Sequence, residues 1–185
     1  IRRRAQLSKN TLVLKNDFNL TEDQLEKVFL LPHMVYVLSP MLGLSINSIL
    51  YTNAKLFKIG YIAEDKCTFC KSESETLIHL FFNCVYSKLF WKDFEFYYNS
   101  VSNKLLRLSL RDILIGIIAE QCPLLNYFRL IANLHLWDCR RSQKRLTIAG
   151  FKTTIKLKLE TEKYICTKNK TSNEFYQKWA LFVTV

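Results

Sequence analysis

Residues 67–84 of the chain read CTFCKSESETLIHLFFNC, and this stretch decides the fold class. It places Cys67, Cys70, His79 and Cys84 in the spacing C-x2-C-x8-H-x4-C. Thiolate and imidazole are ligands that Zn²⁺ prefers in four-coordinate tetrahedral sites. Because the protein would fill all four positions, none is left for water or substrate. The sequence therefore predicts a structural zinc site, a CCHC site with no catalytic role.

Two other interpretations of these cysteines stay open. Cys67 and Cys70 could form a disulfide, or all could be reduced thiols with His79 nearby by chance. A disulfide framework needs an oxidising compartment, and the charged opening IRRRAQ has no apolar stretch typical of a secretory signal. We therefore expect an intracellular, reducing environment, cytoplasmic and nuclear. The remaining cysteines are expected to pack in apolar surroundings: Cys122, Cys139 and Cys166.

The residues around the motif predict short helices. Gly60 suits the position just past a helix over 53–59. Ser72 and Glu75 have capping-box spacing, so a helix carrying His79 is expected to begin near residue 73. His79 and Cys84 differ by about 140° around a helix, because each residue advances by about 100°. We therefore expect the helix to end or distort near residue 83 and Cys84 to begin the next one.

Further along the chain, caps and 3.6-residue periodicity predict more helices. Ser109 and Asp112 can cap a helix through residue 118. Pro123 suits the first position of a long helix that continues to about residue 146 and is broken by Gly150. Two final helices are expected over 151–168 and 173–183. Upstream, the same signals predict helices over 21–31 and 41–51, and at most one short strand pair, near 12–14 or at the 67–70 turn.

Composition agrees with a mainly α fold, in which a small helical domain around the zinc site is followed by a basic helical tail. The chain has 185 residues, 49% of them hydrophobic, with only 4 Gly and 3 Pro. Scarce Gly and Pro argue against a β-sandwich rich in turns. No apolar run approaches the length of a membrane span, so no membrane partner is expected. We expect three parts: an arm with a connecting helix over 1–40, the zinc domain over 41–98 and the basic segment over 105–185.

Positive charge gathers in the last quarter of the chain. The formal net charge is +11, and residues 140–185 contribute 11 basic and 3 acidic side chains, or +8. A clustered positive field most often meets phosphate. A solvated helix face is the competing interpretation. The residues expected to contact nucleic-acid backbone, with little sequence preference, are Arg140, Arg141, Lys144, Arg145, Lys152 and Lys156.

Catalytic signatures are missing from the sequence. It has no Gly-rich phosphate loop, no G-x-S-x-G and no H-E-x-x-H. His33 and His135 are isolated, and His135 lies on an apolar helical stripe, which favours a core histidine over a catalytic one. We therefore expect no active site in this segment.

The stretch around the motif also matches a known pattern. Its residues fit a lead-in TN-x2-L-x-K-x-G, then C-x-F/L-C, then E-T-x2-H-L-F and a final Cys before an aromatic, through Thr52, Asn53, Leu56, Lys58, Gly60, Cys67, Phe69, Cys70, Glu75, Thr76, His79, Leu80, Phe81, Cys84 and Trp91. Over about residues 45–95 the chain resembles the zinc-binding region that follows the polymerase domain in reverse transcriptases of LINE-type (non-LTR) retrotransposons. The basic tail is similar, more loosely, to the C-terminal segment of such proteins.

The resemblance implies a piece of a polyprotein whose endonuclease and reverse transcriptase lie upstream. No Tyr-x-Asp-Asp motif occurs in this chain, so any polymerase activity would belong to that upstream part. The expected function is a non-catalytic, nucleic-acid-binding tail that holds template RNA or target DNA. The alternative is a docking module that packs on the upstream reverse transcriptase domain through residues 85–98. A catalytic domain is a third, weaker possibility.

Overall fold

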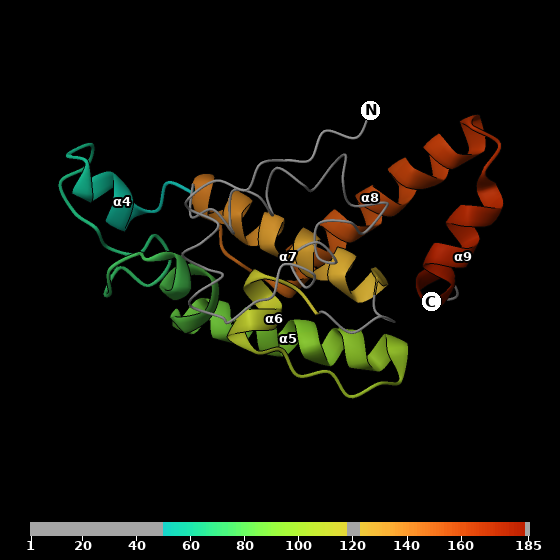
Figure 1. The fold of residues 1–185 in the computed structure, drawn as a ribbon, viewed down its shortest axis with the longest axis horizontal. Helices are drawn as coiled ribbons and strands as arrows, with labels where there is room; N and C mark the ends of the chain where they lie inside the picture. Colours follow the sequence, from blue (N-terminus) through green and yellow to red (C-terminus); the bar gives the residue numbers. More distant parts are fainter. Residues whose placement is uncertain (1–49, 118–122, 184–185) are drawn as a thin grey trace, which may run out of the picture.

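The structure, a computed structural model, describes residues 50–117 and 123–183. Within these ranges the regular elements are all helical, which confirms the mainly α fold (Figure 1). An isolated antiparallel bridge between Lys66 and Ser74 frames the Cys67–Cys70 turn, where a short strand pair was expected. The expectations for the basic arm, for a strand near 12–14, and for helices over 21–31 and most of 41–51 lie outside the described residues.

The first described helix, α4 (Asn53–Lys58), ends as the sequence predicts. Gly60 has φ +73°, the left-handed conformation that glycine adopts without strain. The Gly60 amide donates to the Phe57 carbonyl and the Tyr61 amide to the Leu56 carbonyl, both at 2.9 Å. These two bonds form a Schellman motif, which satisfies the last carbonyls of the helix. In Figure 1, α4 forms one end of the molecule.

The segment carrying His79 differs from the expected capping box. The helix begins at Leu77, because Thr76 rather than Ser72 caps it, with the Thr76 hydroxyl accepting from the His79 amide at 3.0 Å. Glu75 is buried and turned away from the helix start to other partners. The prediction of a helix beginning near residue 73 was wrong, because the Glu75 carboxylate binds donors from distant segments.

After one α-helical turn the chain forms η1 (His79–Asn83), a π-helical turn. Here the Cys84 amide donates to the His79 carbonyl at 2.7 Å, an i→i+5 bond. Two side chains from the next helix satisfy neighbouring carbonyls: Ser87 Oγ donates to Leu80, and Trp91 Nε1 donates to the carbonyl of Phe81 at 2.7 Å. The expected distortion near residue 83 is confirmed.

Helix α5 (Val85–Ser102) begins directly after Cys84, as expected, and buries one stripe. The stripe follows the i, i+3/i+4 rule and consists of Ser87, Phe90, Trp91, Phe94, Tyr98 and Ser102. The helix ends at Asn103, whose φ of 52° is left-handed. Phe90 and Phe94 contact the ring of Phe151 from a later helix, with centroids 6.0 and 5.4 Å apart. The division of the chain near 99–104 stays a prediction.

Helix α6 (Leu110–Leu114) carries the predicted capping box. Ser109 Oγ accepts from the Asp112 amide at 3.2 Å, and the Asp112 carboxylate accepts from the Ser109 amide at 2.9 Å. The helix is shorter than the predicted span to residue 118. It ends before Gly116, whose φ of +120° lies outside the helical region.

Helix α7 (Pro123–Arg141) is the central helix, and Pro123 is its first residue, as predicted. The sequence suggests one apolar stripe, but every residue from 125 to 133 is buried. Its buried polar residues bond to the end of α6. Arg129 Nη1 and Asn133 Nδ2 both donate to the Ile113 carbonyl at 2.8 Å, and Asn126 exchanges two bonds with the backbone of Ile117. These bonds satisfy part of the polar groups that α7 buries, while Arg129 Nε and Asn133 Oδ1 have no hydrogen-bond partner among the described residues.

The connection after α7 contradicts the expected long helix through residue 146. The helix ends at Arg141, and Gln143 takes the left-handed conformation, φ 53°. The Lys144 amide donates to the Cys139 carbonyl at 2.9 Å and the Gln143 amide to the Arg140 carbonyl at 3.3 Å, again a Schellman pattern. Lys144 therefore does not share a helix with Arg140.

Gly150 does not break a helix; it lies in the first turn of α8 (Ile148–Lys168). Thr147 caps this helix by accepting from the Gly150 amide at 3.1 Å. A Cβ on Gly150 would lie 3.0 Å from His135 Cε1, so glycine allows α8 to approach α7 closely. Helix α8 extends away from α7 and α9 (Ser172–Val183) folds back beside it (Figure 1).

A hydrophobic core links η1 and helices α5 to α9, with Phe94, Phe128, Phe151 and Trp179 fully buried in it, whereas α4 contributes no buried residue. Half-buried Glu162 of α8 fixes α9 at the edge of this core. Its carboxylate accepts from Tyr127 of α7, from Lys178 at 2.8 Å and from the Trp179 indole at 2.9 Å. Of the helices described, none is long and apolar enough to cross a membrane.

Candidate metal centre

The four side chains singled out by their spacing converge. One ligand atom from each of Cys67, Cys70, His79 and Cys84 lies within 4.8 Å of the others. Cys67 Sγ is 3.9 Å from Cys84 Sγ, and Cys70 Sγ is 3.3 Å from His79 Nε2. Sulfurs bound to one tetrahedral zinc at about 2.3 Å lie about 3.8 Å apart, so these separations fit such an ion. This Cys3His group could hold a metal ion.

Each ligand has a local reason for its position. The Cys67–Cys70 turn is closed by the Lys71 amide, which donates to the Cys67 carbonyl at 2.9 Å, and Lys71 itself has φ 59°. The Cys67 amide donates to the Glu73 carbonyl at 2.8 Å and holds the turn to the segment that returns after it. Cys84 is the residue immediately before α5, and His79 is the first residue of the π-helical turn.

Two of the three sulfurs, those of Cys70 and Cys84, favour the thiolate that metal binding needs. A hydrogen bond from the Cys67 thiol lowers the pKa of Cys84 to about 5, and the same bond raises the pKa of Cys67. Burial alone would raise the pKa of Cys70, but the Glu73 amide, Ser72 and His79 lower it to about 7. Metals bind the thiolate rather than the thiol. Cys67, whose pKa is raised, would have to lose its proton when a metal binds.

Neighbouring groups support the ligands from outside. Ser72 Oγ lies 3.2 Å from Cys70 Sγ and donates to it. His79 Nδ1 is buried and lies 3.2 Å from Glu73 Oε2, at ion-pair distance but without hydrogen-bond geometry. A carboxylate beside the second imidazole nitrogen is the usual way to fix the tautomer and ring orientation of a metal-binding histidine.

The cysteines bear on the alternatives as well. Cys67 and Cys84 are free thiols whose sulfurs lie well beyond the 2.05 Å of a disulfide, and Cys70 is also free.

Cys139 is buried and its sulfur lies 3.6 Å from His135 Nε2. His135 also contacts Thr154 Oγ1 through Nδ1 at 3.2 Å and packs against the ring of Phe151. Burial lowers the pKa of His135, as for a neutral core histidine.

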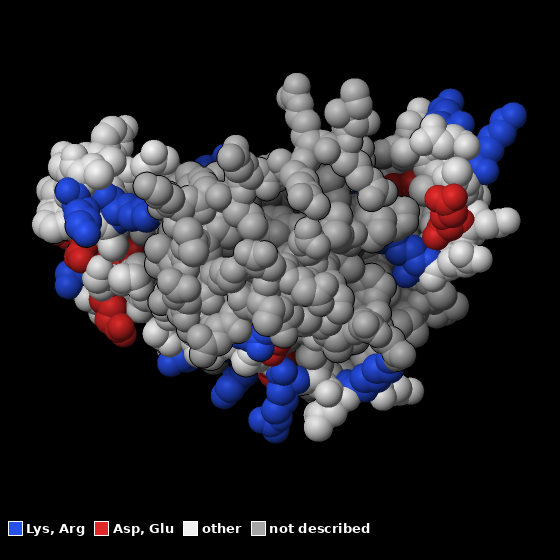
Figure 2. All heavy atoms as spheres, viewed as in Figure 1, with Lys and Arg blue, Asp and Glu red and all other residues white. Residues whose placement is uncertain are grey.

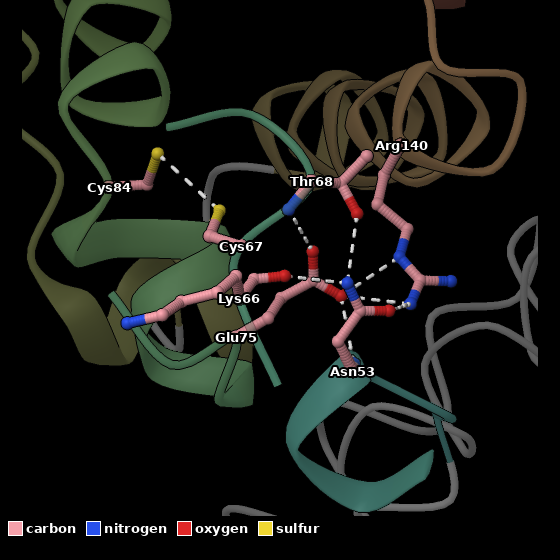
Figure 3. A network of polar contacts seen from close by, with 7 residues as sticks. All are labelled: Asn53, Lys66, Cys67, Thr68, Glu75, Cys84 and Arg140. Atoms are coloured by element: carbon pink, nitrogen blue, oxygen red, sulfur yellow. Dashed lines mark hydrogen bonds and ion pairs between the residues drawn. The ribbon is translucent and has the colours of Figure 1, made fainter. Parts of the chain in front are cut away.

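Behind the cysteine turn lies a polar network that spacing could not reveal (Figure 3). The carboxylate of Glu75, fully buried, accepts from the Thr68 amide at 2.6 Å and from the Asn53 amide at 3.0 Å. Arg140 Nη2 lies 2.8 Å from the same carboxylate and 2.7 Å from Asn53 Oδ1. Asn53 Nδ2 in turn donates to the Lys66 carbonyl at 2.7 Å.

This network gives Arg140 a different environment from the other cations expected to contact nucleic acid. Its side chain is only 12% exposed and is paired with Glu75. Arg141 is exposed and pairs with Asp138 at 3.1 Å. Lys144 and Arg145 are exposed in the loop after α7. Lys152 and Lys156 are exposed one helical turn apart on α8, and Lys152 Nζ lies 4.5 Å from the ring centre of Tyr97.

The missed residues had little signal in the sequence. Glu75 appears there as a capping residue and, with Asn53, within the family-like pattern around the motif, and Arg140 appears as one of several cations at a helix end. They are 65 positions apart, and only the tertiary structure brings them together.

Comparison with known proteins agrees with the geometry of this site. Residues 14–91 match the model of a family described as zinc-binding in reverse transcriptase, and the match includes all four converging side chains. No curated protein and no solved structure matches the chain.

Proposed function

We propose that this chain is a non-catalytic, zinc-stabilised segment that binds nucleic acid beside a reverse transcriptase, of the LINE (non-LTR) type that the motif resembles. The observation that carries the proposal is the convergence of four thiol and imidazole groups inside a stretch matching a zinc-binding family. All four positions come from the protein, so the zinc would serve folding rather than catalysis. The upstream part of the polyprotein would supply the polymerase.

Support for nucleic-acid binding comes from a basic patch that we define as Lys144, Arg145, Lys152 and Lys156. These residues lie along the loop after α7 and the first turns of α8, and all four are exposed. No ion pair within the described residues involves them. Figure 2 shows Lys and Arg side chains projecting from several edges of the molecule. Contact with phosphate needs only charge and reach, so template RNA and target DNA are both suitable ligands.

A salt titration of RNA binding tests the proposal. Replacing the four patch residues with Gln removes four cations. The log K against log[salt] slope is then expected to flatten by about 3 units, at roughly 0.7 to 0.9 per phosphate contact. The matched control replaces four exposed cations elsewhere with Gln, namely Lys88, Lys92, Lys104 and Arg107. Equal effects in the two variants would mean that net charge, not this patch, governs binding.

A second candidate function is docking on the upstream reverse transcriptase domain, and an exposed apolar stripe on α5 favours it. Val85, Leu89 and Phe96 are 55%, 54% and 78% exposed. Exposed apolar groups of this size mark interaction surfaces when they are contiguous. Docking through this stripe would be insensitive to salt, whereas backbone binding weakens steeply with it. An unchanged RNA affinity and slope in the patch variant would leave docking as the better proposal.

A further inference from the structure

The carboxylate of Glu75 lies where three segments of the chain meet. The carboxylate accepts a hydrogen bond from the amide of Thr68, which lies in the turn between the first two cysteines. Asn53 begins α4, and Arg140 belongs to the last turn of α7. Figure 3 shows the Glu75 side chain pointing from the cysteine hairpin toward both helices, with the Cys67 and Cys84 sulfurs beyond Thr68. One buried carboxylate therefore contacts the cysteine turn, α4 and α7 together.

Because the Glu75 carboxylate is buried, it needs all of its protein donors at the same time. Glu75 is fully buried, so its carboxylate depends on protein donors rather than water. An ionised group in such a place is costly when any donor is lost, because desolvation is no longer compensated. Arg140 supplies the only opposing charge that the described residues place on it, through Nε at 3.0 Å and Nη2 at 2.8 Å.

Arg140 is itself held in one orientation. Its guanidinium lies 4.8 Å from the ring centre of Trp137 and bonds to Asn53 Oδ1. A planar, oriented guanidinium can serve a carboxylate and an amide oxygen at once, which a lysine ammonium cannot do with the same geometry. The turn with Cys67 and Cys70 is therefore linked, through Glu75, to an oriented guanidinium at the end of α7.

We infer that Glu75 and Arg140 are positioning residues for the metal centre, which couple metal binding at the cysteine turn to the order of the C-terminal end of α7. Removing the metal frees the turn, and the Thr68 amide then no longer holds the carboxylate in place against Arg140. Conversely, removing Arg140 leaves the carboxylate without its cation, so the turn loses its alignment with His79 and Cys84.

Zinc affinity of the full 185-residue chain tests the inference. Arg140→Gln is expected to weaken zinc binding about tenfold or more, the usual effect of losing a supporting contact behind metal ligands. Arg141→Gln is the matched control, because Arg141 is adjacent, exposed and paired only with Asp138 in the described residues. Competition with a chromophoric chelator measures both. Equal affinities in the two variants would overturn the inference.

Hydrogen exchange supplies a second readout, because a loss of global stability would speed exchange along the whole of α7 rather than at its C-terminal end alone. In the unmodified chain, stripping zinc with a chelator is expected to speed exchange at residues 67–84 and also at 136–144. In Arg140→Gln, zinc removal should affect only 67–84, because the link to α7 is gone. Zinc-independent exchange at 136–144 in the unmodified chain would contradict the coupling.

Folding of the variants is checked by circular dichroism with excess zinc. Should Arg140→Gln lack the helical spectrum, Arg140→Lys against Arg141→Lys repeats the comparison with the charge retained. The double variant Glu75→Gln, Arg140→Gln completes a cycle. If the two residues act together, the double variant should have a zinc affinity no lower than that of the single variant that binds zinc more weakly. If instead the fold-loss of zinc affinity in the double variant equals the product of the two single losses, the residues act separately and the pairing is refuted.

Discussion

The backbone amide of Cys84 lies 2.7 Å from the carbonyl oxygen of His79, five residues earlier. This bond makes the turn π-helical and brings the two side chains within reach of Cys67 and Cys70. A regular α-helix would direct positions five apart to different sides, about 140° from each other. The widened turn is thus the backbone feature that completes the Cys3His group.

The ligand set makes a prediction for zinc content. Cys84→Ser is expected to lower bound zinc well below one per chain and to lower the melting temperature by about 10 °C, because metal binding is coupled to folding. Elemental analysis and thermal denaturation measure the two effects. Cys166→Ser, a half-buried free cysteine on α8, serves as control and should retain its zinc. Full zinc content in Cys84→Ser would exclude this ligand set.

Two glycines with positive φ should respond differently to alanine. At Gly60, φ is +73° and a Cβ would meet nothing within 4 Å, so Gly60→Ala should cost only the left-handed strain of about 1 kcal/mol. At Gly116, φ is +120° and a Cβ would lie 3.0 Å from Asn126 Oδ1 and 3.3 Å from the Arg129 guanidinium.

Gly116→Ala should therefore destabilise the chain by about 2–3 kcal/mol, from backbone strain together with displacement of buried polar groups. Urea denaturation with saturating zinc compares the two variants. Equal losses at the two glycines would show that the contact with Asn126 relaxes freely.

Glu162 should make stability depend on pH. Burial alone would raise its pKa, but hydrogen bonds from Lys178, Tyr127 and Trp179 outweigh burial and hold the pKa below the ordinary 4.5. The ionised carboxylate is therefore favoured by folding. Its contribution is complete above about pH 4.5 and is lost as pH falls through the folded pKa.

Glu162→Gln should accordingly be less stable than the unmodified chain by about 1–2 kcal/mol at pH 7. The gap should narrow when pH falls below 4.5. At each pH the free energy of unfolding of Glu162→Gln is subtracted from that of the unmodified chain. This difference cancels the effect of zinc loss, because both proteins lose zinc at low pH. A gap that stays constant down to pH 3 would show that the charge of Glu162 does not matter.

The capping box of α6 makes a smaller prediction. Ser109→Ala removes the hydroxyl that accepts from the Asp112 amide and should cost about 1 kcal/mol in the free energy of unfolding. Ser100→Ala is the control, because among the residues that the structure describes the exposed Ser100 hydroxyl bonds only to a carbonyl inside α5. Similar unfolding free energies for the two variants would indicate that α6 is held by packing rather than by its cap.

The sequence by itself determined the local features of this protein. Gly60 at the end of α4, the Ser109 and Asp112 cap and Pro123 at the start of α7 were all predicted, because each depends on the conformation or hydrogen bonding of a few adjacent residues. The metal-ligand spacing was equally local, since a C-x2-C turn and a following helix fix which side chains can converge. Even the distortion between His79 and Cys84 followed from counting residues per turn.

Only the tertiary structure decided what the charged residues do. Glu75 could cap a helix by its spacing, and Arg140 could contact a phosphate by its charge. Neither role accounts for the partner 65 residues away. The helix end at Arg141 likewise required Gln143 to adopt a left-handed conformation that its residue type does not announce. A buried carboxylate takes whichever donors the packed chain presents, so its pairing with Arg140 follows from the approach of α7 to the cysteine turn, which the pattern around the motif does not encode.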